Sequence, residues 1–203
     1  ELKKLDSEIL SAGKKLSAAR KKIIPRLSKA VSKQLEDLGF RQSKFDVAMN
    51  PLIRPSATFS PSDGEKDEMQ SVSSNGFDEI EFQFAPNLGE PAKSLRAIAS
   101  SGEMARVMLA LKTVLATEDE IPVLVFDEVD TNVGGETANV VGEKMKQIAA
   151  KRQVLCITHL PQVAAPADSH FVVTKQIKHG RTISEIHRLD QKARVAELTR
   201  MLG

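Results

Sequence analysis

Three acidic side chains follow directly on an apolar run in the stretch VLVFDEVD, residues 123–130. Asp127 and Glu128 are adjacent, and Asp130 comes two positions later. Carboxylates grouped at the end of a buried strand raise the free energy of the fold unless something positive or polar meets them. The sequence therefore predicts a site at this strand end, completed by a partner that the strand itself does not supply.

A second candidate site lies in ASSGEMAR, residues 99–106, where a run with helical periodicity begins. Serine is a good N-cap, and Glu103 is favoured at the positive end of a helix. A helix N-terminus that carries a serine hydroxyl and small residues is also a site for an anion. Ser100, Ser101 and Gly102 are therefore candidate anion-binding residues, and simple capping of the helix is the plain structural alternative.

A histidine marks a third position: His159 stands in THLPQ, just after the apolar run QVLCI. In an open parallel sheet the carboxyl ends of the strands share one edge, and ligands bind there. Asp127, Glu128 and His159 are therefore predicted to be neighbours in space. Each signal alone is weak, because a histidine after a strand is usually structural and an acidic pair is often a solvated strand end. Their combination in this order is specific.

The elements that would position these residues alternate between helix and strand from residue 93 onward. The first helix has six apolar residues on one face: Met104, Val107, Met108, Leu111, Val114 and Leu115. Strands at 122–127 and at QVLCIT flank a helix at about 135–150, whose inward residues are Val141, Met145 and Ile148. Strand, helix and strand in this order imply a parallel sheet covered by helices.

The C-terminal part is predicted to hold three smaller elements. A short helix begins near Pro161, and HFVVTKQ and RTISEIH form a hairpin turned by KHG. Asp190 is placed to cap a last helix. Upstream, KFDVAMN and DEIEFQFAP alternate apolar and polar residues and are predicted to pair as an antiparallel hairpin. The segment between them, SPSDGEKDEMQSVSSNG, has the composition of a loop.

The first 24 residues carry an apolar heptad pattern, typical of the seam of a coiled coil. The seam residues are Leu2, Leu5, Ile9, Ala12, Leu16, Ala19 and Ile23. We interpret residues 1–24 as the end of a coiled-coil arm and residues 25–203 as the lobe that follows. A surface helix packed on the domain is the alternative. Pro25 interrupts the pattern, and a helix can resume beyond it until Gly39.

Composition excludes several classes of protein. The 203 residues suffice for one domain with an appendage, and no apolar run is long enough for a bilayer or a signal peptide, so no membrane partner is expected. The net charge of +2 does not indicate a nucleic-acid-binding protein. The absence of Trp and Tyr argues against proteins that stack bases on aromatic side chains. The single Cys156 is expected to be a small buried hydrophobe. Because the chain begins at Glu1, we expect it to be a piece of a longer protein.

The three motifs together resemble the C-terminal half of an ABC-type ATPase head of the SMC-like class. The similarity is greatest to the RecN family of bacterial DNA repair proteins, over SLRAIASSGEMARVMLALKTVLA, PVLVFDEVDTNVGG and RQVLCITHLPQVAAPAD. The resemblance implies an α/β fold: the C-terminal lobe of a P-loop ATPase head, with a parallel sheet flanked by helices, a small antiparallel β part and a coiled-coil stub.

The resemblance also implies roles for the acidic residues and the histidine. VLVFDE stands at the Walker B strand, where Asp127 would hold Mg²⁺, mostly through water. Glu128 would position or deprotonate the attacking water. Asp130 falls in the D-loop, which crosses the dimer interface, and is taken as a cofactor-binding residue. His159 matches the switch histidine that senses the γ-phosphate.

ASSGE stands at the signature motif, so Ser100, Ser101, Gly102 and Glu103 are expected to bind ATP held by the opposite protomer. The Ser100 hydroxyl and the Gly102 N–H would contact the γ-phosphate. Ser101 departs from the family, which usually has glycine there: its N–H can still donate, but its side chain would crowd a close phosphate. Asn132 also stands where glycine is common, and asparagine tolerates the positive φ of a tight turn.

The sequence contains no Gly-x-x-x-x-Gly-Lys-Ser/Thr, the P-loop that cradles phosphates. In this family the P-loop lies in an N-terminal half, beyond a long antiparallel coiled coil. The resemblance therefore implies three partners: that N-terminal half, a second copy in a head-to-head dimer closed around ATP, and the ends of double-stranded DNA. The implied location is the cytoplasm, at the nucleoid, and the chain alone is expected to be inactive.

Three hypotheses for the function follow. The first is an ATPase of DNA double-strand break repair. The alternative is a nucleotide-gated structural clamp that tethers DNA ends, in which ATP binding rather than hydrolysis does the work. A third and weaker hypothesis is a DNA-binding module that needs no nucleotide.

Overall fold

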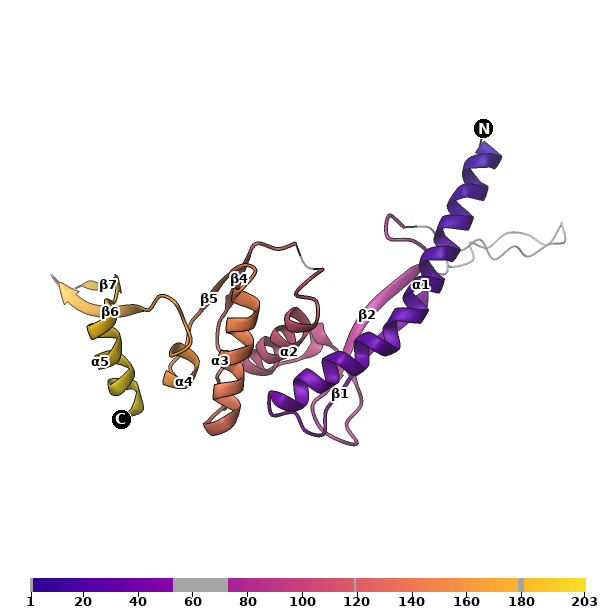
Figure 1. Ribbon diagram of the computed structural model, residues 1–203. Helices are drawn as coiled ribbons and strands as arrows, with labels where there is room; N and C mark the ends of the chain where they lie inside the picture. Colours follow the sequence, from indigo (N-terminus) through magenta and orange to yellow (C-terminus); the bar gives the residue numbers. More distant parts are fainter. Residues whose placement is uncertain (1, 53–72, 119, 179–180) are drawn as a thin grey trace. The chain divides into compact units, whose positions relative to one another are not determined.

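The computed structural model describes residues 2–52, 73–118, 120–178 and 181–203. Figure 1 shows its elements, which form two compact units. Unit 1 comprises Glu1–Lys33 and Gln42–Ala97, and unit 2 comprises Gln34–Arg41 and Ile98–Gly203. These units are defined by contacts within the chain, so they do not test the predicted boundary between a coiled-coil arm at 1–24 and a lobe at 25–203. That boundary stays a prediction.

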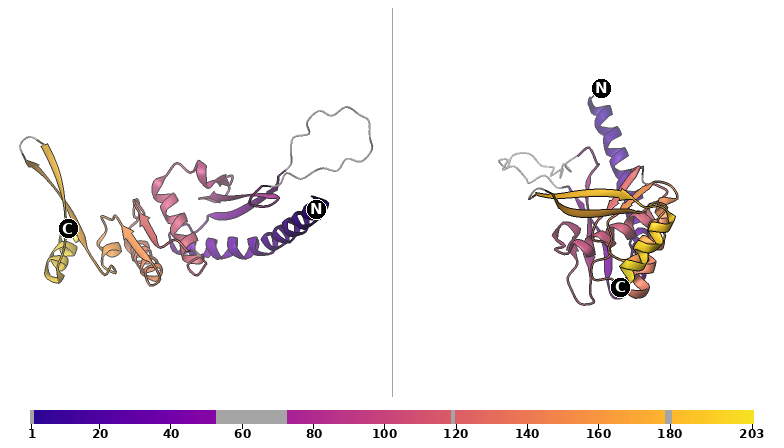
Figure 2. Two further views of the ribbon diagram at one scale, coloured as in Figure 1. Left: turned by 90° about the horizontal axis from the view of Figure 1, so that it is seen from above. Right: turned by 90° about the vertical axis from the view of Figure 1, so that its left-hand side faces the viewer.

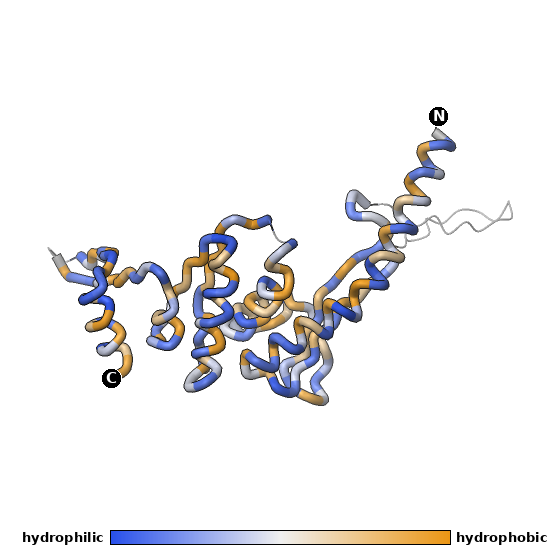
Figure 3. The backbone as a smooth tube through the Cα atoms, in the orientation of Figure 1, coloured by the Kyte–Doolittle hydropathy of each residue, from blue (hydrophilic) through white to orange (hydrophobic). Residues whose placement is uncertain are grey.

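Helix α1 runs from Leu2 to Asp37 and passes through Pro25 without ending. Pro25 therefore interrupts the hydrophobic pattern but not the helix. Figure 3 shows apolar and polar positions alternating along α1. Beyond Pro25 the apolar stripe is buried, with Val31 and Leu35 fully covered. Before Pro25 the predicted seam is exposed: Leu5, Ile9, Leu16 and Ile23 are each 40–58% accessible.

Unit 1 holds an antiparallel sheet of β1 (Lys44–Pro51), β2 (Asp78–Ala85) and β3 (Lys93–Ser94), followed by a short 3₁₀ helix at Leu95–Ala97. The predicted hairpin is confirmed: Phe45 lies opposite Phe84, and Val47 opposite Phe82. The rings of Phe45 and Phe82 are 5.7 Å apart. Most of the predicted polar loop, residues 60–72, lies outside the described residues.

Helix α1 is fastened to the turn that precedes β2. Gly13 is buried against Phe77, and a Cβ at Gly13 would lie 2.1 Å from that ring. One turn further along the helix, Ser17 donates a hydrogen bond to Asp78, and Arg20 forms an ion pair of 3.3 Å with the same carboxylate. The face of α1 that packs on this turn is therefore adjacent to the apolar seam, and it shares Leu16 with the seam, since a Cβ at Gly76 would lie 2.9 Å from the Leu16 side chain.

Unit 2 is built around two parallel strands, β4 (Val123–Phe126) and β5 (Gln153–Cys156), joined by helix α3 (Gly135–Ala149). The predicted strand–helix–strand unit is thus confirmed. Figure 1 shows α3 running beside the two strands, and Val141, Met145 and Ile148 are buried as predicted. Helix α4 (Pro161–Ala164) follows β5 and packs on α3.

Only one face of the β4–β5 pair is covered. Leu124 and Phe126 point into the core, whereas Val125 and Leu155 are 64% and 47% exposed. Both faces of a parallel sheet are normally buried. The strands, predicted to be buried, therefore leave an apolar surface uncovered in unit 2.

Helix α2 (Ser101–Val114) buries a different face from the one that the apolar pattern predicted. Val107 and Leu111 are buried as expected, but the covered face also includes Arg106, Leu109 and Ala110. Of the six predicted residues, Met104, Met108, Val114 and Leu115 are only partly covered. The buried face of α2 includes the charged Arg106, so a search for apolar residues alone did not find this face.

The chain ends in an antiparallel hairpin and a helix, as predicted. Strand β6 (Phe171–Lys178) pairs with β7 (Arg181–Arg188), and helix α5 (Gln191–Leu202) follows, as Figure 2 shows. The Asp190 side chain accepts a hydrogen bond of 2.8 Å from the N–H of Ala193, which confirms the predicted cap. The turn residues 179–180 lie outside the described part. None of the helices in the described ranges has the length and hydropathy of a membrane span.

The packing of Gly13 on Phe77 leads to a stability prediction. Gly13→Ala is expected to lower the free energy of unfolding by about 2 kcal/mol, because the added methyl group overlaps the ring. At an unobstructed helix position the same change would stabilise by roughly 1 kcal/mol. Urea unfolding followed by circular dichroism measures the effect, with Ser11→Ala, exposed on the same helix, as the control. An unchanged or raised stability of Gly13→Ala would show that the contact does not hold.

Candidate active site

Helix α2 is capped at its N-terminus and has backbone N–H groups that no residue of the helix accepts. Ser100 is the N-cap, in extended conformation, and its Oγ accepts a hydrogen bond of 3.3 Å from the N–H of Glu103. The N–H groups of Ser101 and Gly102 belong to the first turn, where backbone donors have no partner inside the helix. The predicted capping is confirmed, and it leaves two backbone donors for an anion.

Strand β4 ends in a tight turn that carries the acidic residues. The Thr131 N–H donates to the Glu128 carbonyl at 3.1 Å, and the Val133 N–H donates to the Asp130 carbonyl at 3.1 Å. Asn132 has a φ of +58°, which confirms that asparagine replaces glycine in a left-handed position. Glu128 also has a positive φ, +56°. A left-handed conformation is unusual for glutamate and is found mainly where the surroundings impose it.

Asp130 ties the end of β4 to the end of β5. Its side chain is 2% exposed, and Oδ2 accepts hydrogen bonds from the Thr158 hydroxyl, from the N–H of His159 at 3.0 Å and from the N–H of Leu160 at 3.3 Å. The Oδ2 atom of Asp130 is thus engaged inside the protein. A direct contact of Asp130 with a nucleotide stays a prediction, whereas its support of the 158–160 loop is structural.

The predicted neighbours are brought to one edge. Residues 126 and 156 are paired in the parallel register, and the Ile157 N–H donates to the Phe126 carbonyl at 2.9 Å. Asp127 and Glu128 therefore leave β4 beside the point where the chain turns toward His159. All three side chains are exposed, and the His159 Nδ1 lies 3.3 Å from Asp130 Oδ2.

The signature-like segment meets the same turn. Ser101 Oγ donates a hydrogen bond to Glu128 Oε2. Gly102 is buried against the turn: a Cβ there would lie 3.2 Å from the Glu128 carbonyl oxygen and 3.0 Å from Thr131 Cβ. The three stretches singled out in the sequence, at 99–106, 127–130 and 159, therefore converge in unit 2.

Arg106 is the residue that sequence reasoning missed. It is 8% exposed, and its guanidinium donates to the Thr131 carbonyl at 2.8 Å and to the Val129 carbonyl at 3.5 Å. The same group lies 4.9 Å from the centroid of the Phe40 ring. Desolvation lowers the pKa of Arg106, while Glu103 opposes that shift. The signal was present, because a lone arginine interrupts an otherwise apolar helix face.

Cys156 lies at the end of β5, close to the acidic group. Desolvation, with further contributions from Asp130 and Asp127, raises the pKa of its thiol to about 12. The thiol is therefore protonated near neutral pH, and a protonated thiol is neither a nucleophile nor a metal ligand. Its half-buried position agrees with the predicted role as a small hydrophobe.

The donor set of this edge suits magnesium better than zinc. In the described residues, no group of three or more His, Cys, Asp or Glu side chains is gathered closely enough to enclose a metal ion. Mg²⁺ is usually held by one or two carboxylates, with water and substrate phosphates completing the shell. The exposed Asp127 at the strand end fits that pattern.

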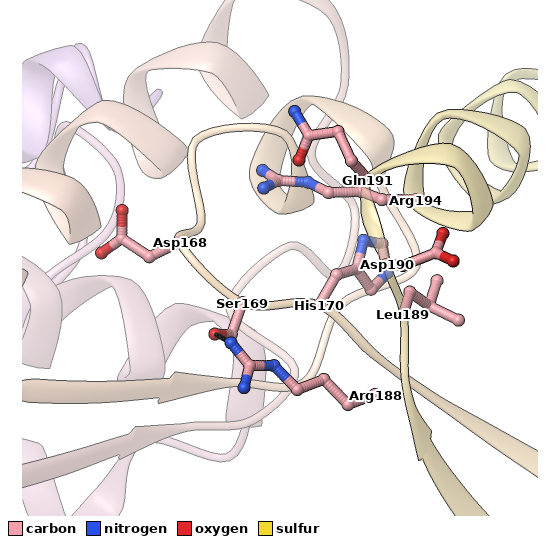
Figure 4. Close-up of a pocket in the computed structure, with 8 residues that line it drawn as sticks. All are labelled: Asp168, Ser169, His170, Arg188, Leu189, Asp190, Gln191 and Arg194. Atoms are coloured by element: carbon pink, nitrogen blue, oxygen red, sulfur yellow. Dashed lines mark hydrogen bonds between the residues drawn. The ribbon is translucent and has the colours of Figure 1, made fainter.

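Figure 4 shows a pocket whose lining includes none of the predicted site residues. It is lined by Asp168, Ser169, His170, Arg188, Leu189, Asp190, Gln191 and Arg194. Its two arginines are engaged within the chain: Arg188 donates to Ser169 Oγ at 3.1 Å, and Arg194 donates to the carbonyls of Ala165 and Ala167. These hydrogen bonds connect α5 and β7 to the segment after α4. We therefore interpret the polar residues around this pocket as structural.

The burial of Arg106 leads to a second prediction. Arg106→Leu is expected to lower the free energy of unfolding by about 2 kcal/mol, because the carbonyls of Thr131 and Val129 lose their donor. Arg106→Lys keeps the charge but not the planar fork and should recover only part of the loss. Denaturant unfolding measures both, and Arg41→Leu at an exposed position is the control. Equal stability of Arg106→Leu and the unaltered chain would contradict this role.

The chain has relatives among bacterial DNA repair proteins. It is 36% identical to DNA repair protein RecN of Bacillus subtilis, over all of this chain and 36% of that protein. It is 38% identical to RecN of Halalkalibacterium halodurans, over all of this chain and 33% of that protein, and 38% identical to RecN of Treponema pallidum, over all of this chain and 34% of that protein. The chain spans about a third of the length of these curated relatives.

Solved structures support the fold. The Smc head domain with a coiled coil and joint from Pyrococcus yayanosii matches with a TM-score of 0.53 and 20% identity, covering 87% of this chain and 29% of that chain. The Smc head domain with an extended coiled coil from Pyrococcus furiosus, bound to the C-terminal domain of ScpA, gives a TM-score of 0.50 and 20% identity, covering 87% of this chain and 38% of that chain.

No protein-family model matches the chain. The predicted α/β fold of an SMC-type head with a coiled-coil segment is nevertheless confirmed by the structures above, and the resemblance seen in the motifs is confirmed by the relatives. Over its full length, the chain is a homologue of about a third of the bacterial DNA repair protein RecN.

Proposed function

We propose that the chain is the C-terminal lobe of an SMC-like ATPase that acts in DNA double-strand break repair. It supplies the signature motif, the Walker B strand and the switch histidine to composite ATP sites in a head-to-head dimer. The observation that carries the proposal is the convergence of the three motifs: Ser101 bonds to Glu128, and Asp130 fastens the loop of His159 beside the same strand end. Separate structural roles for the motifs would not require this convergence.

The substrate is ATP, and Glu128 orients the attacking water or accepts its proton. A carboxylate suits this role when it is within hydrogen-bond reach of the water and held in place. Glu128 is exposed at the strand end, and its backbone is fixed by the turn closed by Thr131. Asp127, one residue earlier, holds Mg²⁺, which when bound neutralises charge on the phosphates.

His159 senses the γ-phosphate. The ring is 69% exposed, and its Nδ1 faces the buried carboxylate of Asp130 at 3.3 Å. A carboxylate on one ring nitrogen favours the tautomer that carries the proton there and fixes the orientation of the ring. Nε2 is then the nitrogen that faces away from Asp130, and it donates to a γ-phosphate oxygen when both ring nitrogens carry a proton. Asp130 therefore acts on this site through His159.

The start of α2 binds the ATP of the opposite protomer. The Ser100 hydroxyl and the first backbone N–H groups, at Ser101 and Gly102, are the donors, and the positive end of the helix favours the phosphate charge. Glu103, in the same first turn, is the last residue of the signature motif. Since one protomer offers its signature motif to the ATP of the other, the site requires a homodimer.

The main phosphate grip comes from an N-terminal half of the same protein that carries the P-loop. Two observations support this. The sequence contains no P-loop, and the outer face of β4 and β5 exposes Val123, Val125, Leu155 and Ile157 to solvent in unit 2. An apolar face of this kind is a surface that another layer covers in α/β folds. The P-loop half supplies that layer.

The exposed seam of α1 pairs with the other arm of a coiled coil. Leu5, Ile9, Leu16 and Ile23 keep their a/d spacing and remain accessible, although the neighbouring face docks through Gly13 and Ser17. A helix that is docked on one side and apolar on another has a second partner to bind. The returning arm of the N-terminal half is that partner.

The biological substrate is the end of double-stranded DNA. The relatives are named DNA repair proteins, and the structural matches are Smc heads. The net charge of only +2 does not mark this chain as strongly basic. The protein acts in the cytoplasm, at the nucleoid.

The test reconstitutes the site. This chain is mixed with the N-terminal portion of its own full-length protein, and ATP hydrolysis is measured with and without Mg²⁺. Hydrolysis should appear only in the mixture with Mg²⁺. Glu128→Gln should retain ATP binding, lower turnover by about 100-fold or more, and accumulate ATP-bridged dimers. Wild-type turnover in Glu128→Gln would refute its role as the residue that orients or deprotonates the attacking water.

The same mixture separates the enzyme from the clamp. If hydrolysis drives repair, tethering of DNA ends in the presence of ATP should cycle, and a non-hydrolysable analogue should lock it. If binding alone suffices, tethering with ATP, with the analogue and in Glu128→Gln should be equal. Salt-sensitive DNA binding by this chain without nucleotide would instead favour a plain DNA-binding module.

A further inference from the structure

The side chain of Ser101 is directed to an unexpected partner. Its Oγ donates a hydrogen bond to Glu128 Oε2 in the same chain. Glycine is usual at this position in the family that the motif resembles, so glycine-containing heads lack this donor. The serine adds a polar contact between the start of α2 and the end of β4.

The backbone around this contact is held from several sides. Gly102, next to Ser101, lies so close to the turn that a Cβ would be 3.2 Å from the Glu128 carbonyl oxygen. That carbonyl accepts the Thr131 N–H at 3.1 Å. Arg106, one turn further along α2, donates to the Thr131 carbonyl at 2.8 Å. Ser101 and Glu128 are therefore presented to each other by packed backbone rather than by a mobile loop.

The Glu128 side chain needs such a contact. It is exposed, and a glutamate has three side-chain torsions whose ordering costs free energy. A group that handles the attacking water must be held close to one geometry, because small misplacements slow the reaction strongly. Within the described part of the chain, the hydrogen bond that restrains this carboxylate comes from Ser101.

We propose that Ser101 is a positioning residue for Glu128. The inference rests on the proposed function and adds a residue to it. The hydroxyl fixes Oε2, so that Oε1 faces the water, while the N–H of the same residue stays available to the phosphate of the opposite protomer. The side chain and the backbone of Ser101 thus serve two different ATP sites. The crowding expected from a serine at this position is avoided because its hydroxyl is turned to Glu128.

The experiment uses the reconstituted or full-length protein and measures steady-state ATP hydrolysis. Ser101→Ala should lower kcat roughly tenfold, the effect of about one net hydrogen bond, and should leave KM within about twofold. Ser101→Thr keeps the hydroxyl and should restore kcat to within about threefold of wild type. Ser7→Ala, at an exposed position of α1, is the matched control and should match wild type. If Ser101→Ala does not fold, Ser101→Gly replaces it with the same expectation.

The split between kcat and KM decides the inference. A rise in KM at unchanged kcat would mean that the hydroxyl acts on the nucleotide, and it would overturn the assignment. Equal losses in Ser101→Thr and Ser101→Ala would also overturn it. In a Glu128→Gln background, single-turnover rates should no longer respond to Ser101→Ala, and an undiminished response contradicts the proposal.

The failure of the inference is distinguishable from that of the function. If wild type hydrolyses ATP and Glu128→Gln does not, an unchanged kcat in Ser101→Ala would overturn only the positioning role of Ser101 and would leave the proposed function standing. If wild type shows no Mg²⁺-dependent hydrolysis, the proposed function fails and the positioning role fails with it.

Discussion

The candidate site depends on one buried carboxylate. Asp130 is almost fully covered, and its Oδ2 collects donors from Thr158, His159 and Leu160. A buried charge is tolerated only when it is paired and hydrogen-bonded, so these contacts hold the 158–160 loop against the turn after β4. Without them, the ends of the two strands would be joined only by the ladder between them. The Asp130 carboxylate therefore holds the segments after β4 and β5 next to each other.

Helix α2 packs against the first of these segments. Gly102 is pressed against the turn, Arg106 donates to the carbonyls of Val129 and Thr131, and Ser101 reaches Glu128. The positive φ of Glu128 fits this arrangement, because an unusual backbone conformation persists where packing on several sides imposes it. The result is a prearranged edge whose exposed groups are an acidic pair, a histidine and a helix N-terminus. The sequence contains no P-loop motif, and in the proposed function an N-terminal half of the protein supplies it.

Elements with a local or periodic signal were predictable from the sequence. The β4–α3–β5 unit follows from alternating apolar segments, the caps at Ser100 and Asp190 from serine and aspartate preceding helical runs, and the left-handed Asn132 from its turn chemistry. The meeting of the strand-end residues follows from the shared edge of a parallel sheet. These signals are carried by residue type and spacing alone.

The remaining features depend on contacts between distant residues. The lone arginine on an apolar helix face was visible in the sequence, but its partners were not, since they are carbonyls of another segment. Nothing local gives Glu128 a positive φ. The fit of Phe77 into the space left by Gly13 joins positions far apart in the chain. The apolar face of β4 and β5 looks like a set of core positions in the sequence, because an apolar strand residue has the same signal whether it is buried in this chain or exposed. The roles of Asp127, Glu128, Ser100 and His159 in catalysis remain predictions.

The most direct measurement of the central claim is a double-mutant cycle between Asp130 and Thr158, read as the free energy of unfolding of this chain. Asp130→Asn should cost about 3 kcal/mol, because the donors of the 158–160 loop lose a charged acceptor. Thr158→Val should cost on the order of 1 kcal/mol alone and much less once Asp130 is replaced, with a coupling of at least about 1 kcal/mol. Additive costs, or an Asp130→Asn variant as stable as the unaltered chain, would show that this carboxylate does not hold the two strand ends together.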